Sequence, residues 1–434
     1  MSPSAPPGRR AADSVPGPAA PAPVSEGGAS RIQKPRRAAP EGAVRPTRAE
    51  VNLGHLRHNL RVLERSMGGA LAPGAAMPTK IWGVLKADGY GHGAPAAART
   101  LERAGITGLC VALLEEAIEL RDAGIHVPIL VMGGYYGSRL DGLEEILEND
   151  LLPVVYDAGQ IERIAAFARA QGHARVSVHL KVDTGMGRLG ASPAELDAVF
   201  EALALHREVR LDGLMTHFAC ADGDDLGTTH AQLRAFRAIE KRAAGHGLVP
   251  RVRHAANSAA MLRVPEARFE VVRPGIALFG VSPLDATASE AGGVPELKPV
   301  MRVRTEIVAL RSIPTGDRIG YGHTWQADRP SLIATVPIGY ADGLSRLLSN
   351  RGHMLARGRR APIAGTVSMD MTMIDVTDIP GAKLGDEIVV LGAQEGPLGK
   401  DVIGAAEIAA HMGSIPWEVL TSISRRVPRF YREP

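Results

Sequence analysis

Cysteine is scarce in this sequence of 434 residues, which contains only Cys110 and Cys220. Both lie in apolar, strand-like segments, where a free thiol behaves as a small hydrophobic side chain. Two cysteines supply neither a disulfide framework nor a cysteine-based metal site, so we expect no metal site and take the cytoplasm as the default compartment. Apolar runs of the roughly 20 residues that span a bilayer are also missing, and no membrane partner is expected.

A large net charge is missing as well, since the formal net charge is +3 although the pI is about 8.9. Residues 1–48 contain eight Lys and Arg against three Asp and Glu, a net charge of +5. The remaining residues therefore carry −2 of the total of +3. A basic surface for nucleic acid is disfavoured, and we expect no nucleic-acid partner.

The composition changes twice along the chain. Residues 1–46 are rich in Pro, Ala, Gly and Ser without apolar periodicity, which predicts a disordered tail. Residues 284–434 alternate apolar and polar side chains in short runs, which predicts a mainly β C-terminal domain. The segment 281–299, with its Gly-Gly pair, is expected to be the linker before that domain.

Between these segments, residues 47–283 alternate helical and strand-like patterns with single short strands. This alternation predicts a parallel (β/α)8 barrel, in which functional side chains gather at the C-terminal ends of the strands. Ser192-Pro193-Ala194-Glu195 has the signals of a helix start. The first helix is expected to bury one face, made of Leu53, Leu56, Leu60 and Leu63.

The first candidate for chemistry is a lysine at the end of a predicted strand. The apolar run 81–85 is followed at once by Lys86 and a glycine-rich turn that contains Tyr90. Apolar neighbours desolvate the amine, favour its neutral form and make it a nucleophile toward carbonyls. The turn could bring backbone amides and a phenol close to a phosphate. A lone lysine in this position is more often an ordinary surface residue.

The segment Val84-Leu85-Lys86-Ala87-Asp88-Gly89-Tyr90-Gly91-His92-Gly93 closely resembles the cofactor-lysine motif of the alanine racemase family. The resemblance extends over roughly residues 47–432 and implies a barrel followed by a β domain. It also implies that Lys86 binds pyridoxal 5′-phosphate covalently and that Tyr90 contacts the cofactor phosphate. Related folds place a cofactor lysine after their first strand too, so other residues must indicate the reaction.

Two further segments at predicted strand ends, 257–260 and 273–276, offer amides and small residues, although either alone could be an ordinary barrel loop. The resemblance implies a phosphate site that includes Asn257, Ser258, Gly275 and Ile276.

The same resemblance places Arg273 opposite the pyridine nitrogen. A guanidinium stays protonated, so the ring becomes a weaker electron sink, which suits proton exchange at Cα. The related decarboxylases have glutamate there. From the residues alone, Arg273 could instead pair with an acid near Glu270. His217 resembles the family histidine that packs beside the ring and bonds toward this arginine, although a histidine on an apolar strand is more often a core residue.

The segment 179–188, HLKVDTGMGR, contains the candidate residues for substrate binding. Arg188 would bind the substrate carboxylate with its planar fork. Lys181 lies close by in sequence and would repel Arg188 as a cation. The family carbamylates the matching lysine, and the resemblance implies the same for Lys181. Met369 and Asp370 match residues that line the substrate pocket from a second subunit.

Racemisation needs proton exchange on both faces of a planar carbanion, so a second base is required besides Lys86. Gly320-Tyr321-Gly322-His323-Thr324 resembles the motif whose tyrosine does this work from the other subunit of a homodimer. A cationic neighbourhood formed by His217 and Arg273 is expected to lower the pKa of Tyr321 below about 10. Taken alone, this Gly-Tyr-Gly would be only a β-turn.

The sequence therefore predicts racemisation of alanine by two bases, supplying D-alanine for peptidoglycan. A broad-specificity or serine racemase, a decarboxylase and a non-catalytic cofactor carrier remain as alternatives. Arg273 disfavours the decarboxylase, and the β domain disfavours the carrier. One departure from the family pattern is Arg425, at the position that often holds a phosphate-contacting tyrosine. Its role stays open, and Tyr340 is expected to narrow the mouth of the site.

Overall fold

The computed structural model describes residues 43–68, 78–135, 141–173, 175–284 and 296–433. The tail predicted for residues 1–46 lies almost wholly outside the described residues, and so does most of the linker predicted for 281–299. Within the described ranges, no helix has the length and apolar character needed to cross a membrane.

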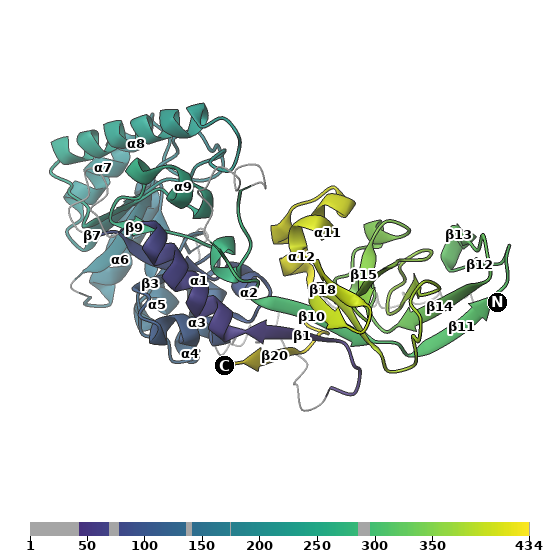
Figure 1. Ribbon diagram of the computed structural model, residues 1–434. Coiled ribbons are helices and arrows are strands. Elements are labelled where there is room, and N and C mark those ends of the chain that lie inside the picture. The colour runs from purple at the N-terminus through teal and green to yellow at the C-terminus, as the bar shows by residue number, and fades with distance from the viewer. Residues whose placement is uncertain (1–42, 69–77, 136–140, 174, 285–295, 434) are drawn as a thin grey trace, which may run out of the picture. The chain divides into compact units, whose positions relative to one another are not determined.

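Eight parallel strands form a nearly closed barrel, which confirms the predicted fold class (Figure 1). Their order in the sheet is β8-β7-β6-β5-β4-β3-β2-β9. The barrel closes just beyond the strand ends, where the Arg273 N–H donates to Ala256 O at 2.9 Å. The strands are β2 (Lys80–Val84), β3 (Gly108–Val111), β4 (Ile129–Val131), β5 (Leu152–Val155), β6 (Val176–Lys181), β7 (Val209–Met215), β8 (Val252–His254) and β9 (Val271–Val272).

Helices separate these strands, as the apolar periodicity predicted. The predicted apolar face of α1 is buried in full, and Asn52 caps the helix by accepting from the His55 N–H at 3.0 Å. The expected helix start at Ser192 is wrong by a few residues: Glu195 does accept from the Ser192 N–H, but residues 193–195 form a turn before α7. The helices are α1 (Leu53–Ser66), α2 (Lys86–Tyr90), α3 (Ala94–Arg103), α4 (Leu114–Asp122), α5 (Asp141–Glu148), α6 (Ala158–Ala170), α7 (Leu196–Leu205), α8 (Gly227–Gly245) and α9 (Ser258–Arg263).

The apolar face of α1 offers a stability test. Leu60 is fully buried, so Leu60→Ala is expected to lower the free energy of unfolding by about 2–5 kcal/mol, through lost apolar burial and the cavity left behind. Chemical denaturation followed by circular dichroism measures this loss. Arg65→Ala, which alters the exposed side of the same helix, should change stability by less than about 0.5 kcal/mol. Equal losses in both variants would contradict the assigned face.

The C-terminal part is mainly β, as predicted. Its largest sheet has the order β16-β15-β18-β10-β1-β20, with β19 added to β18, and β11-β14-β17 and β12-β13 form two smaller sheets. The elements are β10 (Met301–Glu306), β11 (Ala309–Ile313), β12 (Arg318–Ile319), β13 (Trp325–Gln326), β14 (Ser331–Val336), β15 (His353–Ala356), β16 (Arg359–Pro362), β17 (Thr372–Asp375), β18 (Glu387–Gly396), β19 (Gly399–Ile403), α11 (Ala405–Met412), α12 (Pro416–Ser422) and β20 (Arg429–Arg432).

The large sheet also contains a strand that the sequence reading missed, β1 (Arg48–Asn52). This strand pairs antiparallel with β10 and parallel with β20, although it directly precedes the first barrel helix. Its alternating sequence is only five residues long, and its pairing partners lie hundreds of residues away along the chain. The register of such a strand is decided by those partners and not by its own residues.

The C-terminal elements contact the turn that follows β2. The Arg429 guanidinium donates through Nε to Gly91 O at 3.0 Å. Gly91 has φ +78°, and a Cβ at this position would collide with Leu420 O of α12. Only glycine fits there, because the backbone is left-handed and α12 lies against it.

The two cysteines differ in their surroundings. Cys110 is buried in β3, as expected, and burial raises the pKa of its thiol to about 12. Cys220 is exposed in the bend beyond β7, so the expectation that it lies in an apolar strand is wrong. Both thiols are free.

Candidate active site

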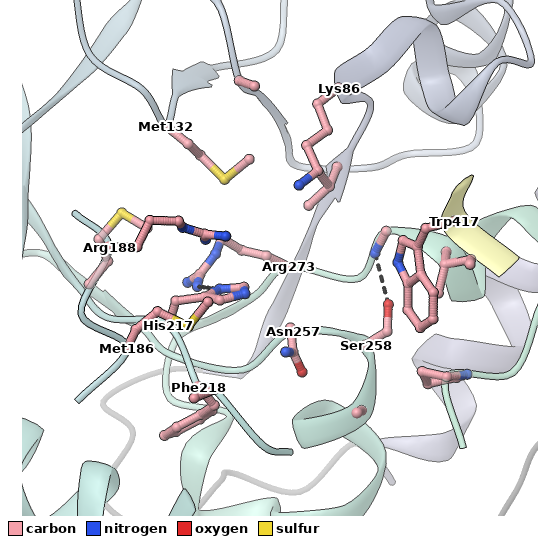
Figure 2. Close-up of a pocket in the computed structure, with 18 of the residues that line it drawn as sticks. Lys86, Met132, Met186, Arg188, His217, Phe218, Asn257, Ser258, Arg273 and Trp417 are labelled. Carbon is pink, nitrogen blue, oxygen red and sulfur yellow. Dashed lines mark hydrogen bonds between the residues drawn. The ribbon is translucent and has the colours of Figure 1, made fainter. Parts of the chain in front are cut away.

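A cavity of about 410 Å³ opens at the C-terminal ends of the barrel strands (Figure 2). It brings together side chains that are up to about 330 residues apart in the sequence, from Val84 to Trp417. The predicted site residues that line it are Lys86, Tyr90, Lys181, Arg188, His217, Asn257, Ser258, Arg273, Gly275 and Ile276.

Lys86 opens a left-handed turn at the end of β2. Ala87, Asp88, Gly89 and Tyr90 follow one another with φ values of 51°, 58°, 61° and 52°. A non-glycine residue in this region costs roughly 1–3 kcal/mol, so the turn must be held by its surroundings. Burial and the Arg188 guanidinium lower the pKa of Lys86, while Glu116 opposes them. The amine points into the cavity and is neutral more often than that of an ordinary lysine (Figure 2).

One end of the cavity consists of backbone amides, hydroxyls and small residues. The Gly275 N–H donates to Ser258 Oγ at 2.9 Å, and Asn257 caps α9 by accepting from the Ala260 N–H at 3.0 Å. A Cβ on Gly275 would collide with the phenol of Tyr90, so the backbone approaches that hydroxyl as closely as glycine allows. This end can hold a phosphate through neutral donors.

Arg273 occupies the floor of the cavity and is buried. It donates from Nη1 to His254 Nδ1 at 2.7 Å and from Nη2 to Thr216 O at 2.8 Å. Burial lowers its pKa to about 10, which leaves the guanidinium charged at neutral pH. The alternative pairing with Glu270 does not occur, because Glu270 binds Arg253 instead.

A chain of hydrogen bonds continues from Arg273 below the cavity. A guanidinium only donates, so His254 must accept at Nδ1 and carry its proton on Nε2. That proton is donated to His179 Nδ1 at 2.8 Å. The proton of His179 is then on Nε2, which lies 3.9 Å from Asp212 Oδ2. Burial holds the pKa of His179 at about 3, so this ring is neutral.

His217 contacts Arg273 at the cavity wall, with 3.5 Å between its Nδ1 and Arg273 Nη2. Burial and the neighbouring Arg273 lower the pKa of His217 to about 3. The expectation that His217 adds positive charge is therefore wrong, since a buried ring beside a permanent cation does not take up the second proton that would make it an imidazolium. The positive charge of this wall belongs to Arg273.

Arg188 and Lys181 add cationic groups to the same side of the cavity as Arg273 and His217 (Figure 2). Arg188 ends a loop whose shape is set by Asp183, which accepts from the N–H groups of Gly185, Met186 and Gly187 at 2.9–3.2 Å. Lys181 ends β6, and burial followed by the charge of Arg188 lowers its pKa to about 8. This side can bind a carboxylate.

Three predicted site residues do not line this cavity within the described chain. Tyr321 is 73% exposed and borders a separate hollow together with Ser368 and Met371. Met369 is also exposed, and Asp370 forms an ion pair with Arg426 at 2.7 Å. A single chain therefore presents Lys86 without Tyr321 in the same cavity.

The sequence reading missed several lining residues, among them Trp417, Met132 and Phe218. Trp417 lies on α12, and its ring stands beside the Ser258 end of the cavity (Figure 2). No local pattern marks Trp417, because it reaches the cavity through the packing of a distant segment. Met132 directly follows β4, so the rule that functional side chains gather at the strand ends could have found it. Arg425 is exposed and is not among the residues that line the cavity.

Comparisons with known proteins agree with this geometry. Residues 51–283 match the family model "Alanine racemase, N-terminal domain" and residues 300–431 match "Alanine racemase, C-terminal domain". The alanine racemase of Sorangium cellulosum (strain So ce56) is 71% identical over 391 residues, which are 90% of this chain and 100% of that protein.

Solved structures are similar over nearly the same length. The alanine racemase from D-cycloserine producing Streptomyces lavendulae has a TM-score of 0.80 at 33% identity, covering 93% of this chain and 98% of that chain. The alanine racemase from Bacillus anthracis with bound L-Ala-P has a TM-score of 0.80 at 32% identity, covering 90% and 96%.

Proposed function

The chain belongs to the alanine racemase family and is an isomerase that racemises alanine, and on this basis we propose that Lys86 and Tyr321 carry its two proton transfers. We propose pyridoxal 5′-phosphate as the cofactor and a homodimer as the working form. One observation carries the proposal, which is that three features share one cavity. They are a lysine amine with a lowered pKa, cationic side chains that can bind a carboxylate, and backbone amides and hydroxyls that can bind a phosphate.

The residues of the cavity fit this cofactor. Lys86 would bond to its aldehyde, and Tyr90, Ser258, Gly275 and Ile276 would hold its phosphate, with Asn257 shaping that segment. When bound, the cofactor withdraws electrons from Cα and so acidifies the α-hydrogen. Arg273 would face the ring nitrogen, with His217 beside the ring. Because Arg273 remains charged at neutral pH, it gives that nitrogen no proton and favours simple proton exchange.

Two side chains would move the proton at Cα. The Lys86 amine accepts or returns it on one face, and its lowered pKa keeps a neutral fraction available at working pH. The Tyr321 phenol serves the opposite face. Its exposure in the single chain supports a role in the cavity of a second copy, together with the exposed Met369 and Asp370.

Arg188 would bind the carboxylate of alanine through its planar fork. We propose that Lys181 is carbamylated, since neutral amine and CO₂ combine to a carbamate with release of one proton. The change turns a cation beside Arg188 into an anion that pairs with it. Burial and Arg188 lower the pKa of Lys181 to about 8, which supplies the neutral amine that this step consumes.

The carbamate can be tested with ¹³C-labelled bicarbonate. Because the pKa of Lys181 is about 8, we expect a ¹³C carbamate resonance that grows as the pH rises through about 8 and declines in acid, where the amine is protonated. Lys181→Ala should remove the resonance, and the exposed Lys383→Ala should keep it. A resonance that survives Lys181→Ala, or none at pH 8, would contradict the proposal.

The reaction itself is tested by incubating pure L-alanine with the protein and analysing the chirality of the product. We expect an equal mixture of L- and D-alanine, the second of which would supply peptidoglycan synthesis. Initial rates on a panel of amino acids test substrate breadth. Faster turnover of serine or lysine than of alanine would favour a broad-specificity or serine racemase. The cytoplasm is the compartment we propose, because two free cysteines suit a reducing environment.

A further inference from the structure

The turn that begins at Lys86 is conformationally demanding. Four consecutive residues, 87–90, have positive φ, and only Gly89 among them adopts such a conformation without steric cost. Part of the turn is held from within, since Gly89 N–H donates to Leu85 O and Gly91 N–H donates to Ala87 O. Neither of these bonds involves the N–H of Ala87, the first residue with left-handed backbone conformation. This group needs a partner outside the turn.

The partner of the Ala87 N–H is the carboxylate of Glu116 on α4. Glu116 Oε1 accepts from Ala87 at 2.6 Å, and Oε2 accepts from Ala112 at 2.8 Å and from Leu113 at 3.1 Å. The two oxygens thus join the turn after β2 to the loop after β3. Helix capping explains only the bonds to Oε2, because the bond from the N-cap Leu113 N–H to Oε2 is the one that a glutamate makes at the start of a helix such as α4. The bond from Oε1 acts on the lysine turn alone.

Glu116 also places a negative charge near the Lys86 amine, whose other charged neighbours are cations. The groups that act on the Lys86 amine from the surrounding elements are Arg188 beyond β6, Lys181 at the end of β6 and Glu116 on α4, while His217 beyond β7 is neutral. Arg188 lowers the pKa of Lys86, and Glu116 raises it. The carboxylate therefore limits how far the amine is driven toward its neutral form.

We propose that Glu116 is the positioning residue of Lys86: its carboxylate holds the left-handed turn that carries the lysine and balances the cations around the amine. This inference rests on the proposed role of Lys86 as the cofactor lysine. Glu116 is not among the residues that line the cavity, and it acts through the backbone of Ala87 and through its charge.

Reloading of the stripped full-length protein with pyridoxal 5′-phosphate tests the proposal. The absorbance band of the bound cofactor is followed in time at each pH, for wild type, Glu116→Gln and Glu115→Gln. The amide introduced by Glu116→Gln keeps one acceptor oxygen and loses the charge, so we expect reloading about tenfold slower. We also expect a pH midpoint lower by about half a unit, since the amine loses the charge that favours its protonated form. Glu115, exposed on the same helix turn, should behave as wild type when replaced.

A rescue experiment separates positioning from general damage. Glycine adopts positive φ without cost, so Ala87→Gly should restore part of the reloading rate lost in Glu116→Ala. An unchanged midpoint in Glu116→Gln, or a double variant as slow as Glu116→Ala, would overturn the proposal. Failure of the underlying function would look different, because Lys86→Ala would then keep the absorbance band.

Discussion

Lys86→Ala is expected to lower racemisation by at least about 10⁴-fold and to remove the visible absorbance band of the lysine-bound cofactor. The variant loses both the amine that bonds to the aldehyde and the base that serves one face of Cα. Because the phosphate end of the cavity does not involve this amine, the cofactor should still bind, though only reversibly. Absorbance spectra and dialysis of the purified variant measure both effects.

Lys80→Ala is the matched control for this variant. Lys80 lies at the opposite end of the same strand, is exposed, and should leave the band and the rate unchanged. An absorbance band that persists in Lys86→Ala would show that another lysine holds the cofactor. Lys181, which also lines the cavity, would then be the next lysine to replace.

Tyr321→Phe is expected to slow exchange of the α-hydrogen from one enantiomer of alanine by about 10²–10⁴-fold, while exchange from the other enantiomer falls much less. The phenol serves one face of Cα, and Lys86 still serves the other. The measurement is uptake of deuterium from solvent, started separately from L-alanine and from D-alanine. Cofactor absorbance should stay unchanged, because Tyr321→Phe retains Lys86 and the residues at the phosphate end of the cavity.

Mixed dimers decide whether Tyr321 acts in the cavity of a second chain. In a dimer of one Lys86→Ala chain and one Tyr321→Phe chain, a composite arrangement leaves one site with both groups intact and the other with neither. Activity should therefore return when the two inactive proteins are unfolded and refolded together. If both groups belonged to one chain, no site would be complete and mixing would restore nothing. Tyr156→Phe, which removes a phenol from the barrel, controls for general effects of losing one.

Much of the fold was predictable because its pattern is local. The apolar face of α1 follows from the helical period, and it is buried as expected. In β10 every second side chain is buried, as the strand period predicts. The same holds for Lys86 at the end of β2 and Lys181 at the end of β6. In a parallel barrel the strand ends meet at one rim, so this placement alone predicted that the two lysines share a cavity.

Other features of the site could not be read from local patterns. His179 and His254 are 75 residues apart, and only the barrel interior brings their rings within hydrogen-bonding distance. The neutral state of His217 depends on how completely the ring is buried and on its distance from Arg273, and only the folded chain sets these two quantities. Trp417 reaches the cavity because α12 lies against the lysine turn.

The sequence by itself determined the alternation of strands and helices in the barrel, the mainly β character of the C-terminal part and the types of side chain available at the strand ends, because hydrophobic periodicity and turn chemistry act between near neighbours. Only the tertiary structure decided the protonation of those side chains and the conformation of the turn that carries Lys86. Desolvation and Coulomb interactions depend on distances between residues far apart in the chain. A left-handed run through Ala87 and Asp88 likewise exists only because Glu116 and the surrounding packing hold it.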